Sequence, residues 1–283
     1  MASQRIRPQE SAEIGIFGGT ANYDTTMLKD SKEIKVYTPY GAPSDFIYVG
    51  WVKDRKVAFL ARHGKRHILP NYKVNWRANI WAFKELGIKR VISPCAVGSL
   101  QPETIKPYEF VVIDQFFDRT TVRRHLSFYE GGVVGHVVFA DPICPELRRV
   151  IIDTARETLT KITVHPTAEE ETQKKSFTYV CIEGPRFSTR AESLVYKNHG
   201  FSVVGMTAIT EAYLCREVEM CYETIALITD TDVYGLLPVN AERVRKSMEE
   251  NVANVNKLIY ELIPKIPKER QCQCAKVLDM SLY

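Results

Sequence analysis

Short apolar runs alternate along the chain with stretches whose apolar residues recur at helical spacing. The clearest run, Ile225–Ile228, has the length and composition of a strand buried on both faces. Other apolar runs predict strands at residues 13–17, 56–61, 90–93, 109–114, 176–182 and 202–206. Spacings of three to four residues with start and stop signals predict helices at residues 73–86, 145–158, 207–218 and 240–262, the last capped by Asn240.

Two connecting segments lack such a pattern, and one further position carries a helix-start signal. Residues 115–120 are aromatic and charged and predict a turn after a strand. Residues 165–175 are polar and rich in acids, which indicates a surface excursion. Ser188, with Glu192 four residues later, is typical of a helix start.

The order of these elements predicts the fold class and the domain organisation. Strands that alternate with helices favour an α/β fold with a largely parallel sheet. No linker, internal repeat or low-complexity segment divides the chain, so we expect one domain over residues 1–263. Residues 264–283 follow as a tail that we expect to be loosely ordered unless it docks.

Composition narrows the function classes. The chain has 283 residues, 45% of them hydrophobic and 25% charged, which is typical of a globular protein. A net charge of +4, spread along the chain, favours an anionic small ligand over nucleic acid. The N-terminal residues carry no signal-peptide core, and no apolar run approaches the roughly 20 residues of a membrane span. We therefore expect a cytoplasmic protein without a nucleic-acid or membrane partner.

Two carboxylates end the apolar run of residues 224–232. Residues two apart on a strand point the same way, so Asp230 and Asp232 could face one ligand. Open α/β sheets place their sites at such carboxyl ends of strands. The alternative is that both Asp residues only cap the turn after the strand.

Two other strand ends carry candidate anion-binding groups. Gly18–Thr20 follows the first strand, and its glycines free backbone N–H groups to face an anion, although taken alone such a sequence is more typical of a plain turn. Arg62 and His63 follow the strand at residues 56–61 and could clamp an oxyanion, since Arg offers a planar fork of donors. The alternative for this pair is an exposed basic turn.

The seven cysteines raise the question of redox state. In a typical cytosol they would be reduced, and an odd number leaves at least one thiol free. The chain has no CxxC pair, and the spacing of Cys272 and Cys274 is tighter than that of a usual structural zinc pair. We therefore expect no metal site.

Taken together, six turns resemble those of a known family. They are Gly18–Thr20, Ala61–Gly64, Val97–Leu100, Glu183–Phe187, Gly205–Thr207 and Thr229–Asp232. Their order resembles that of the trimeric purine nucleoside phosphorylases, and the second half of the chain resembles the 5′-methylthioadenosine phosphorylase branch. The likeness covers roughly residues 14–262. It implies a twisted mixed sheet flanked by helices and a homotrimer, with or without pairing of trimers, whose sites lie near subunit interfaces.

The resemblance also implies roles for individual residues. Phosphate would be held by Thr20, Arg62, His63, Cys95, Ala96 and Thr207. The nucleoside would be bound by Phe187 near the purine, Ser188 on the base side, Met206 under the ribose, and Asp230, Thr231 and Asp232 at the base. His136 matches a histidine that this family lends to the neighbouring subunit's site.

Two positions depart from the family pattern. A valine near the 5′-substituent falls at about Ala241 in this chain. Relatives carry a hydroxyl residue on the phosphate where this chain has Cys95, and a thiol is the poorer hydrogen-bond donor.

The cysteines resemble those of a disulfide-bearing branch from hyperthermophilic archaea. The candidates for bridging are Cys144, Cys215, Cys221, Cys272 and Cys274. A bridge from Cys144 to Cys215 or Cys221 would close a loop of roughly 70 residues and stabilise the fold by about 4 kcal/mol. We expect at least one such bridge, with the terminal Cys-x-Cys either bonded to itself or paired with a core cysteine.

The implied reaction is phosphorolysis of 5′-methylthioadenosine to adenine and 5-methylthioribose 1-phosphate. Arg62, His63, Thr20 and Thr207 would fix phosphate, and Asp230, Asp232 and His63 are the candidate catalytic residues. Two Asp residues favour adenine, because relatives that prefer 6-oxopurines use Asn there. No metal or organic cofactor is required, since phosphate is a co-substrate. The alternatives are a broader purine nucleoside phosphorylase and a non-catalytic nucleoside or phosphate sensor on the same fold.

Overall fold

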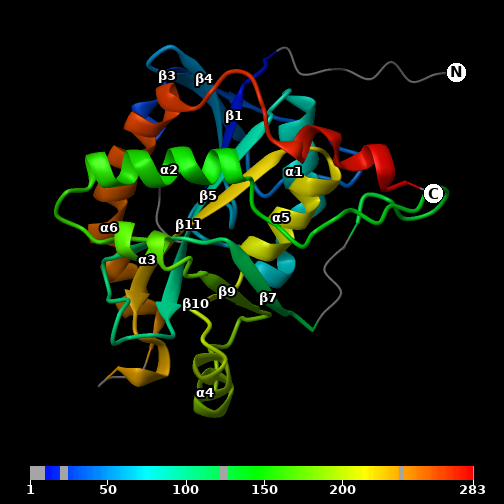
Figure 1. Ribbon diagram of the computed structural model, residues 1–283. Helices are drawn as coiled ribbons and strands as arrows, with labels where there is room; N and C mark the ends of the chain where they lie inside the picture. The colour runs from blue at the N-terminus through cyan, green and yellow to red at the C-terminus, as the bar shows by residue number, and fades with distance from the viewer. Residues whose placement is uncertain (1–9, 20–24, 122–126, 236–238, 283) are drawn as a thin grey trace, which may run out of the picture.

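A mixed sheet forms the centre of the protein (Figure 1). The computed structural model describes residues 10–19, 25–121, 127–235 and 239–282. Within them the main path of the sheet runs through β2 (Lys29–Ile34), β3 (Ile47–Val52), β4 (Arg55–Ala61), β1 (Ile14–Gly18), β5 (Arg90–Ser99), β10 (Val203–Gly205), β9 (Thr178–Ile182) and β7 (Gln115–Arg119). Off this path β11 (Cys221–Asp230) pairs with β5 and β6 (Phe110–Val112), and β6 pairs with β8 (Val164–His165).

Strand β5 is the junction of the sheet. On one edge it runs parallel to β11 from Arg90 to Gly98. On its other edge it pairs with β1 through Ile92, and with β10 only from Gly98 onward. In the described structure the intervening residues 93–97 have no strand partner on that edge. The sheet is therefore split at its centre.

Helices cover both faces of the sheet and bury two apolar cores. Helices α2 (Pro145–Thr158) and α6 (Ala241–Leu262) lie on one side, and α1 (Trp76–Glu85) and α5 (Ala208–Glu217) lie on the other (Figure 1). Helix α4 (Arg190–Asn198) covers the β9–β10 end, where Tyr196 packs with Val180 and Val204. The remaining helical segments are α3 (Ala168–Thr172) and the short 3₁₀ helices η1 (Thr25–Met27), η2 (Asn71–Lys73), η3 (Asp232–Tyr234), η4 (Ile263–Lys265) and η5 (Gln273–Met280).

The predicted fold class is confirmed. Six of the ten strand pairs are parallel, so the sheet is mixed and largely parallel, and helices flank it. The helices predicted from apolar spacing are all present. Helix α2 spans the predicted residues, and the Asn240 side chain caps α6 by accepting from the N–H of Arg243 at 2.9 Å.

Two local predictions were wrong, and a third was incomplete. Residues 115–119 form strand β7 rather than a turn, because they pair with β9 at the exposed edge of the sheet. The excursion at residues 165–175 contains α3, whose N-cap is Thr167 with Glu170 in a capping box. Helix α4 starts one residue later than expected, since Thr189 and not Ser188 forms the capping box with Glu192.

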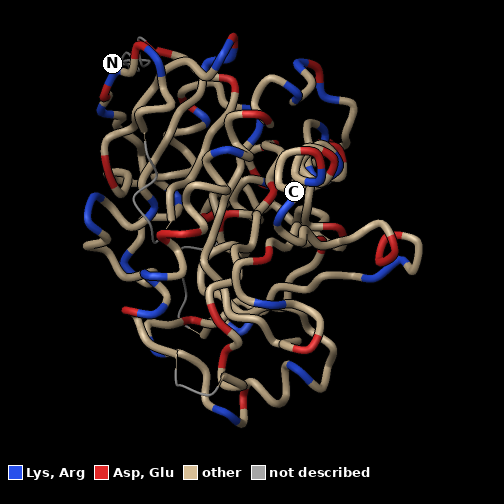
Figure 2. Tube along the Cα trace, turned by 90° about the vertical axis from the view of Figure 1, so that its left-hand side faces the viewer, with Lys and Arg blue, Asp and Glu red and all other residues tan. Residues whose placement is uncertain are grey.

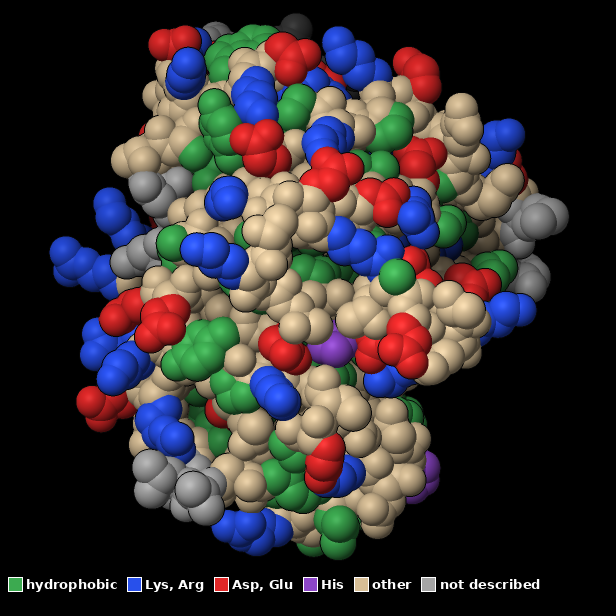
Figure 3. Space-filling view, turned by 60° about the vertical axis from the view of Figure 1, so that its left-hand side comes forward, with side chains coloured by type: hydrophobic (Ala, Val, Ile, Leu, Met, Phe, Trp, Pro, Cys, Tyr) green, Lys and Arg blue, Asp and Glu red, His purple; other side chains and the backbone are tan. Residues whose placement is uncertain are grey.

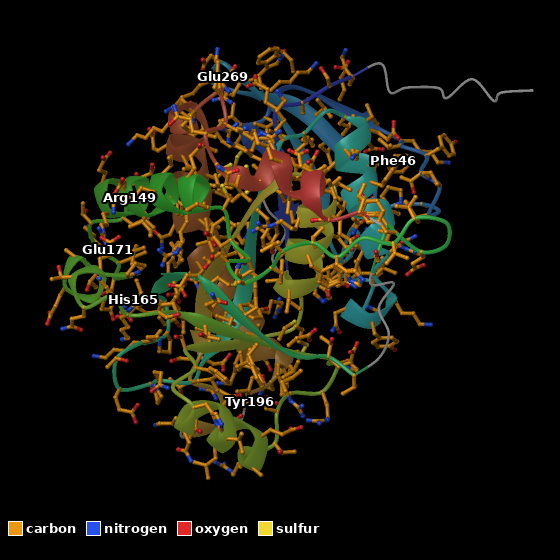
Figure 4. All side chains as sticks on the ribbon, turned by 45° about the vertical axis from the view of Figure 1, so that its right-hand side comes forward. Phe46, Arg149, His165, Glu171, Tyr196 and Glu269 are labelled. Carbon is orange, nitrogen blue, oxygen red and sulfur yellow. The ribbon has the colours of Figure 1, made fainter. Side chains whose placement is uncertain are left out.

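Charged side chains fix the α3 excursion to α2. Arg149 of α2 and Glu171 of α3 lie on adjacent elements, with His165 nearby, and the Arg149 Nη1 and Glu171 Oε1 atoms are 3.1 Å apart (Figure 4). The buried His165 ring contacts Glu170 at 2.8 Å and Glu109 at 3.1 Å. A polar segment is thus ordered by ion pairs where apolar periodicity is missing.

The C-terminal segment is docked. The buried Arg55 donates to the carbonyl of Ile266 at 2.6 Å, and Arg90 donates to the carbonyl of Glu269 at 2.8 Å. In Figure 4, Glu269 lies at the same end of the molecule as the last turns of α6. The expected tail is therefore an ordered strap across the domain.

Charged side chains of both signs are mixed along the described part of the chain. Acidic and basic side chains are interspersed along the trace (Figure 2) and side by side on the face drawn in Figure 3. Within the described residues, no helix combines the length and apolar character that crossing a membrane requires.

Helix α1 packs directly on β1 at a glycine, which generates a stability prediction. A Cβ at Gly15 would lie 2.8 Å from the Phe83 ring and 3.2 Å from Ile88. We expect Gly15→Ala to lower the free energy of unfolding by about 1–3 kcal/mol, as overpacked cores do. The double variant Gly15→Ala/Phe83→Leu should recover part of this loss in denaturant unfolding. An unchanged stability of Gly15→Ala would contradict the close packing.

Candidate functional site

The split in the sheet opens into a cavity of about 530 Å³. Residues 95–98 of β5 form one wall, on the stretch that changes partner between β1 and β10. The ends of β4, β10 and β11 and the start of α6 contribute the other walls. The predicted site residues that line it are Arg62, His63, Cys95, Ala96, Phe187, Ser188, Met206, Thr207, Asp230, Asp232 and Ala241.

Arg62 is a preoriented cation in one wall. Its side chain is only 1% exposed, and its Nε atom donates to the carboxylate of Glu211, which is fully buried. Its Nη2 atom donates to Ser93 at 2.6 Å. Burial opposes the charge, but the adjacent Glu211 carboxylate outweighs it and raises the pKa of Arg62 above its ordinary value. Among the described residues no hydrogen bond uses Nη1, which leaves that nitrogen for a ligand.

Glu211 is held in turn from two other elements. Its Oε2 atom accepts from Ser93 at 2.5 Å and from the Tyr222 hydroxyl at 2.9 Å. Three buried groups on β5, α5 and β11 thus fix one guanidinium. Such a fixed fork of donors fits a tetrahedral oxyanion.

His63 lines the same wall as a neutral ring. Burial and the neighbouring Arg62 charge lower its pKa to about 3. Its Nδ1 atom lies 2.9 Å from the carbonyl oxygen of Leu69, and because a carbonyl only accepts, Nδ1 carries the ring proton. The other ring nitrogen is then an acceptor. His63 can therefore accept a hydrogen bond from a hydroxyl of a bound anion.

The start of α5 faces the cavity through Thr207. This residue is the N-cap of the helix, but its side chain makes no capping hydrogen bond. The backbone N–H of Thr207 contacts the buried Tyr179 hydroxyl at 3.4 Å. The positive end of a helix dipole adds to the field that favours an anion next to Arg62.

Cys95 and Ala96 lie on the unpaired edge of β5. The Cys95 sulfur lies 3.2 Å from the Thr224 hydroxyl, which itself donates to the carbonyl of Ser93 at 2.6 Å. The thiol proton is thus directed at Thr224 and away from the cavity. Burial raises the pKa of Cys95 to about 11, so the side chain is a neutral thiol that offers the ligand no donor.

Asp230 and Asp232 meet at the opposite wall. Asp230 ends β11, and its Oδ1 atom accepts from the N–H of Asp232 at 2.8 Å, so the turn-capping alternative holds together with the cavity-facing one. Burial raises the pKa of both carboxyls. Within the described residues the Oδ2 atom of Asp232 is buried without a hydrogen bond of ordinary geometry, and the nearby Ser193 hydroxyl partly counteracts the rise in the pKa of Asp232. Gly98 makes room for the pair, since a Cβ there would lie 3.0 Å from Asp230 Oδ1.

The rim between these walls carries an aromatic ring and a hydroxyl. Phe187 is half-exposed at the cavity mouth, and the Ser188 hydroxyl is buried without a partner. Met206 lies under Gly184, whose positive φ of 65° and lack of a Cβ allow the sulfur to approach. A flat ring, a free hydroxyl and a thioether form a surface that suits a base and a sugar.

Apolar side chains also line the cavity. Ala241 and Val244 contribute from the first turn of α6, Val239 from just before it, and Ile68 from another segment. The departure at Ala241 therefore leaves valine side chains in this part of the site. A small apolar group fits such a surface better than a hydroxyl does.

Two of the predicted residues in the described part of the chain do not line this cavity, and a third cannot be placed. Thr231 lies between the two Asp residues but does not line it. His136 lies on an exposed loop, where its N–H donates to the carbonyl of Ser281 at 2.8 Å. Thr20 lies outside the described residues.

Several groups at the site had no signal in the sequence. Glu211, Ser93 and Tyr222 lie in apolar helix or strand patterns and meet Arg62 only through the fold. His67 stacks on His63 with ring centroids 4.2 Å apart. A buried acid inside an apolar run, as at Glu211, is the one feature that could have marked a buried partner for a cation.

All seven cysteines are in the described part of the chain, and no disulfide joins them. Cys144 does lie beside Cys221 and the terminal pair, with all four sulfurs within 4.8 Å of one another, but the sulfurs of Cys221 and Cys272 are 3.4 Å apart, longer than the roughly 2.05 Å of a disulfide. The expected proximity of Cys144 to these partners is present, whereas the long-range bridge itself is not formed.

Known proteins share this sequence and fold. The profile of a family described as the Phosphorylase superfamily matches residues 13–264. The S-methyl-5′-thioadenosine phosphorylase of Thermofilum pendens is 50% identical over 273 residues, which are 96% of this chain and 99% of that protein.

Solved structures agree. The crystal structure of a methylthioadenosine phosphorylase from an Antarctic soil metagenomic library matches with a TM-score of 0.87 and 37% identity, over 97% of this chain and 93% of that one. An adenosine/methylthioadenosine phosphorylase variant from Schistosoma mansoni, in complex with methylthioadenosine, matches with a TM-score of 0.83 and 34% identity, over 92% and 93% of the two chains. This chain is a member of the phosphorylase superfamily.

Proposed function

We propose that this protein cleaves 5′-methylthioadenosine with phosphate to give adenine and 5-methylthioribose 1-phosphate. The main support for the proposal is that one cavity has a cation on one wall and two carboxyl groups on another. A fixed cation lies on one side, and two buried carboxyls of raised pKa lie on the other. An anionic nucleophile and a leaving purine need this separation, because phosphate attacks C1′ as the bond from C1′ to N9 breaks. The names of the relatives above support the same substrate.

Phosphate would bind at the Arg62 wall. Nη1 of Arg62 and the start of α5 at Thr207 supply positive potential, and the unpaired edge of β5 at Cys95 and Ala96 supplies backbone groups. His63 would accept a hydrogen bond from the phosphate hydroxyl, which turns an unprotonated oxygen toward the sugar. Fixing the nucleophile in this way lowers the entropic part of the barrier.

The departing purine would be protonated at the Asp wall. As the bond to N9 breaks, its electron pair moves into the ring, and N7 takes a proton from an Asp carboxyl. The proton lost by dihydrogen phosphate on forming the sugar ester balances the one gained by the base. Burial raises the pKa of Asp230, so it holds a proton at higher pH than an exposed Asp does. The Oδ2 atom of Asp232 would accept from the 6-amino group.

The rest of the nucleoside would lie between these walls. Phe187 would cover the purine, Ser188 would donate to the base, and Met206 would pack under the ribose. The methylthio group would point to Val239, Val244 and Ala241. The proposed reaction has no step that calls for a metal ion or an organic cofactor.

A second copy of the chain would complete the site. The loop that carries His136 also exposes the apolar side chains of Val133, Val134 and Val138. We propose that these contact a neighbour in a homotrimer and that His136 reaches the neighbour's cavity. Trimers could further pair into hexamers.

The first prediction tests the reaction itself. Adenine release from methylthioadenosine should require phosphate and should yield the sugar 1-phosphate in equal amount. Adenosine should react more slowly, because its 5′-hydroxyl meets an apolar wall, and inosine slower still. Chromatography of the products would measure this, and adenine release that does not depend on phosphate would refute the proposal.

The second prediction concerns Asp230. We expect Asp230→Asn to lower kcat on methylthioadenosine by at least about 100-fold, with a smaller loss on inosine. The wild-type rate should fall as pH rises through the raised pKa of Asp230, because the carboxylate no longer donates a proton. The Asn variant should lack this decline. Asp232→Asn is the matched control, and an equal loss on both substrates for Asp230→Asn would remove that residue from base recognition.

The third prediction concerns Arg62. We expect Arg62→Ala to raise the KM for phosphate about tenfold or more, with little change in the KM for nucleoside, because a charge-assisted hydrogen bond contributes about 1.5–3 kcal/mol. This variant leaves Glu211 buried without its cation. The double variant Arg62→Ala/Glu211→Gln removes that charge and should show the same shift in phosphate KM with better stability. A shift in the nucleoside KM instead would place the anion site elsewhere.

A further inference from the structure

Another cavity lies where the parallel strands of the sheet begin, away from the proposed active site. Its volume is about 360 Å³, which is within the range of small-molecule pockets. Arg90, the first residue of β5, lines it, whereas residues 95–98 of the same strand line the active-site cavity. The segment before β1, the first residues of β4, the end of β3, the C-terminus of α1 and the strap form its other walls. Among the described residues none lines both cavities, and we name this one the strand-start cavity.

Cationic side chains dominate the walls of the strand-start cavity. Five of the lining residues are Lys or Arg, and one, Glu13, is acidic. The five are Arg55, Lys56, Lys89, Arg90 and Lys268. A concave site with such an excess of one sign of charge concentrates ligands of the opposite sign. The strand-start cavity therefore favours an anion.

The two arginines are fixed parts of the wall. Each is 2% exposed. Arg55 donates to Glu13 at 2.8 Å, and Arg90 donates to Glu146 at the same distance. Arg90 also donates from Nη1 to the carbonyl of Lys268 at 3.3 Å, which holds the strap against the start of β5. Since each arginine has an acid beside it, the net positive charge of the cavity comes from its lysines.

Lys89 and Lys268 carry charge that no acid offsets within the described part of the chain. Both residues are exposed, and neither forms an ion pair or a side-chain hydrogen bond with a described residue. Lys56, by contrast, contacts Glu10 at 2.6 Å. Two free ammonium groups balance the charge of about −1.5 to −2 that a phosphate monoester carries near pH 7. Because ammonium groups also bind phosphate as compact point charges, we expect a monophosphate at these two lysines.

The C-terminus of α1 opposes an anion only weakly. Leu86 is the C-cap of α1 and lines the cavity, so the negative end of the helix dipole lies there. That end is equivalent to about half a negative charge. The two free ammonium groups outweigh it.

An aromatic ring lines the same cavity. Trp51 is 40% exposed, and its ring centroid lies 5.9 Å from the Nζ atom of Lys56. The buried apolar side chains of Ala12 and Leu86 also line the cavity. Nucleotide bases stack on exposed aromatic faces whatever their identity, because each base has a π-face. Free cations and an exposed indole in one cavity together match a phosphate and a planar base.

We propose that the strand-start cavity binds a nucleoside monophosphate, whose phosphate contacts Lys89 and Lys268 and whose base stacks on Trp51. Lys268 belongs to the strap and Lys89 directly precedes β5, so the bound phosphate joins the strap to the sheet. The binding is non-covalent, and no bond of the ligand changes. It is independent of the reaction proposed for the active-site cavity.

The test uses the full-length protein in buffer free of phosphate, with uridine 5′-monophosphate (UMP) as the probe. A pyrimidine lacks the N7 atom that the proposed Asp wall addresses, so UMP is a poor ligand for the active-site cavity. Isothermal titration calorimetry should find one UMP per chain, with a Kd at least about tenfold lower than that of uridine, which lacks the phosphate. Saturating methylthioadenosine should not displace UMP. UMP should also raise the melting temperature, because it binds the folded chain at the strap.

Variants assign the two halves of the ligand. Lys89→Ala/Lys268→Ala should raise the Kd of UMP about tenfold or more and abolish the shift in melting temperature. The matched control is Lys106→Ala/Lys161→Ala, which removes the same charge from exposed positions outside the cavity and should keep the wild-type Kd. Trp51→Ala should raise the Kd of UMP about fivefold or more, whereas it should leave the weaker binding of ribose 5-phosphate unchanged.

No binding of millimolar UMP would overturn the proposal, as would equal Kd values for the wild type and Lys89→Ala/Lys268→Ala. An equal loss in the control variant would reduce the effect to general attraction by charge and would overturn it too. Displacement of UMP by methylthioadenosine would place UMP in the active-site cavity, and an unchanged Kd for Trp51→Ala would leave a site for phosphate anions only; either contradicts the proposal. Phosphate-dependent release of adenine is measured separately, so none of these results decides the proposed function.

Discussion

The change of partner along one edge of β5 is the constraint on which the rest of the structure depends. Because β11 stays paired on the other edge from Arg90 to Gly98, the strand cannot swing out, and the sheet must split where β1 leaves and β10 arrives. Residues 95–97 face a cavity instead of a strand. Arg62, which follows β4, and Asp230, which ends β11, come from strands on different sides of β5, and both line this cavity. One irregularity in hydrogen bonding thus opens the space that both charged groups line.

The cavity handles buried charge in two opposite ways. At Arg62 a second buried ion, Glu211, compensates the cation and is itself held by Ser93 and Tyr222, so the guanidinium stays charged whether or not a ligand is present. At Asp230 burial outweighs the neighbouring hydrogen bonds and the charge of Arg243, and at Asp232 it outweighs the hydrogen bonds, so the pKa of both carboxyls is raised. A permanent cation serves binding of an anion, whereas a carboxyl of raised pKa serves proton transfer. The difference between Arg62 and the two Asp residues arises from the charged groups beside them and not from how deeply each is buried.

Sequence reasoning succeeded where one element carries its own signal. The apolar run of β11 with its terminal Asp pair, and the spacing and cap of α6, are local features. Sequence reasoning failed where contacts with residues distant in the sequence decide the structure of a segment. Strand β7 is half-exposed and has no alternating pattern, and only pairing with β9 makes it a strand. Glu211 and the valines at the start of α6 gain their roles from residues far away in the sequence, and no local pattern records such contacts.

The C-terminal strap shows how such long-range contacts order a sequence that lacks an apolar pattern. Residues 264–283 have little periodicity, yet the buried guanidinium groups of Arg55 and Arg90 donate to carbonyls of the strap. Each arginine needs these acceptors, because a buried donor without a partner is costly. Further along, the strap packs against α2 and the first residue of β11. There the sulfurs of Cys272 and Cys274 lie beside those of Cys144 and Cys221. Since β11 extends from that residue to Asp230, the strap anchors the opposite end of the strand that carries Asp230.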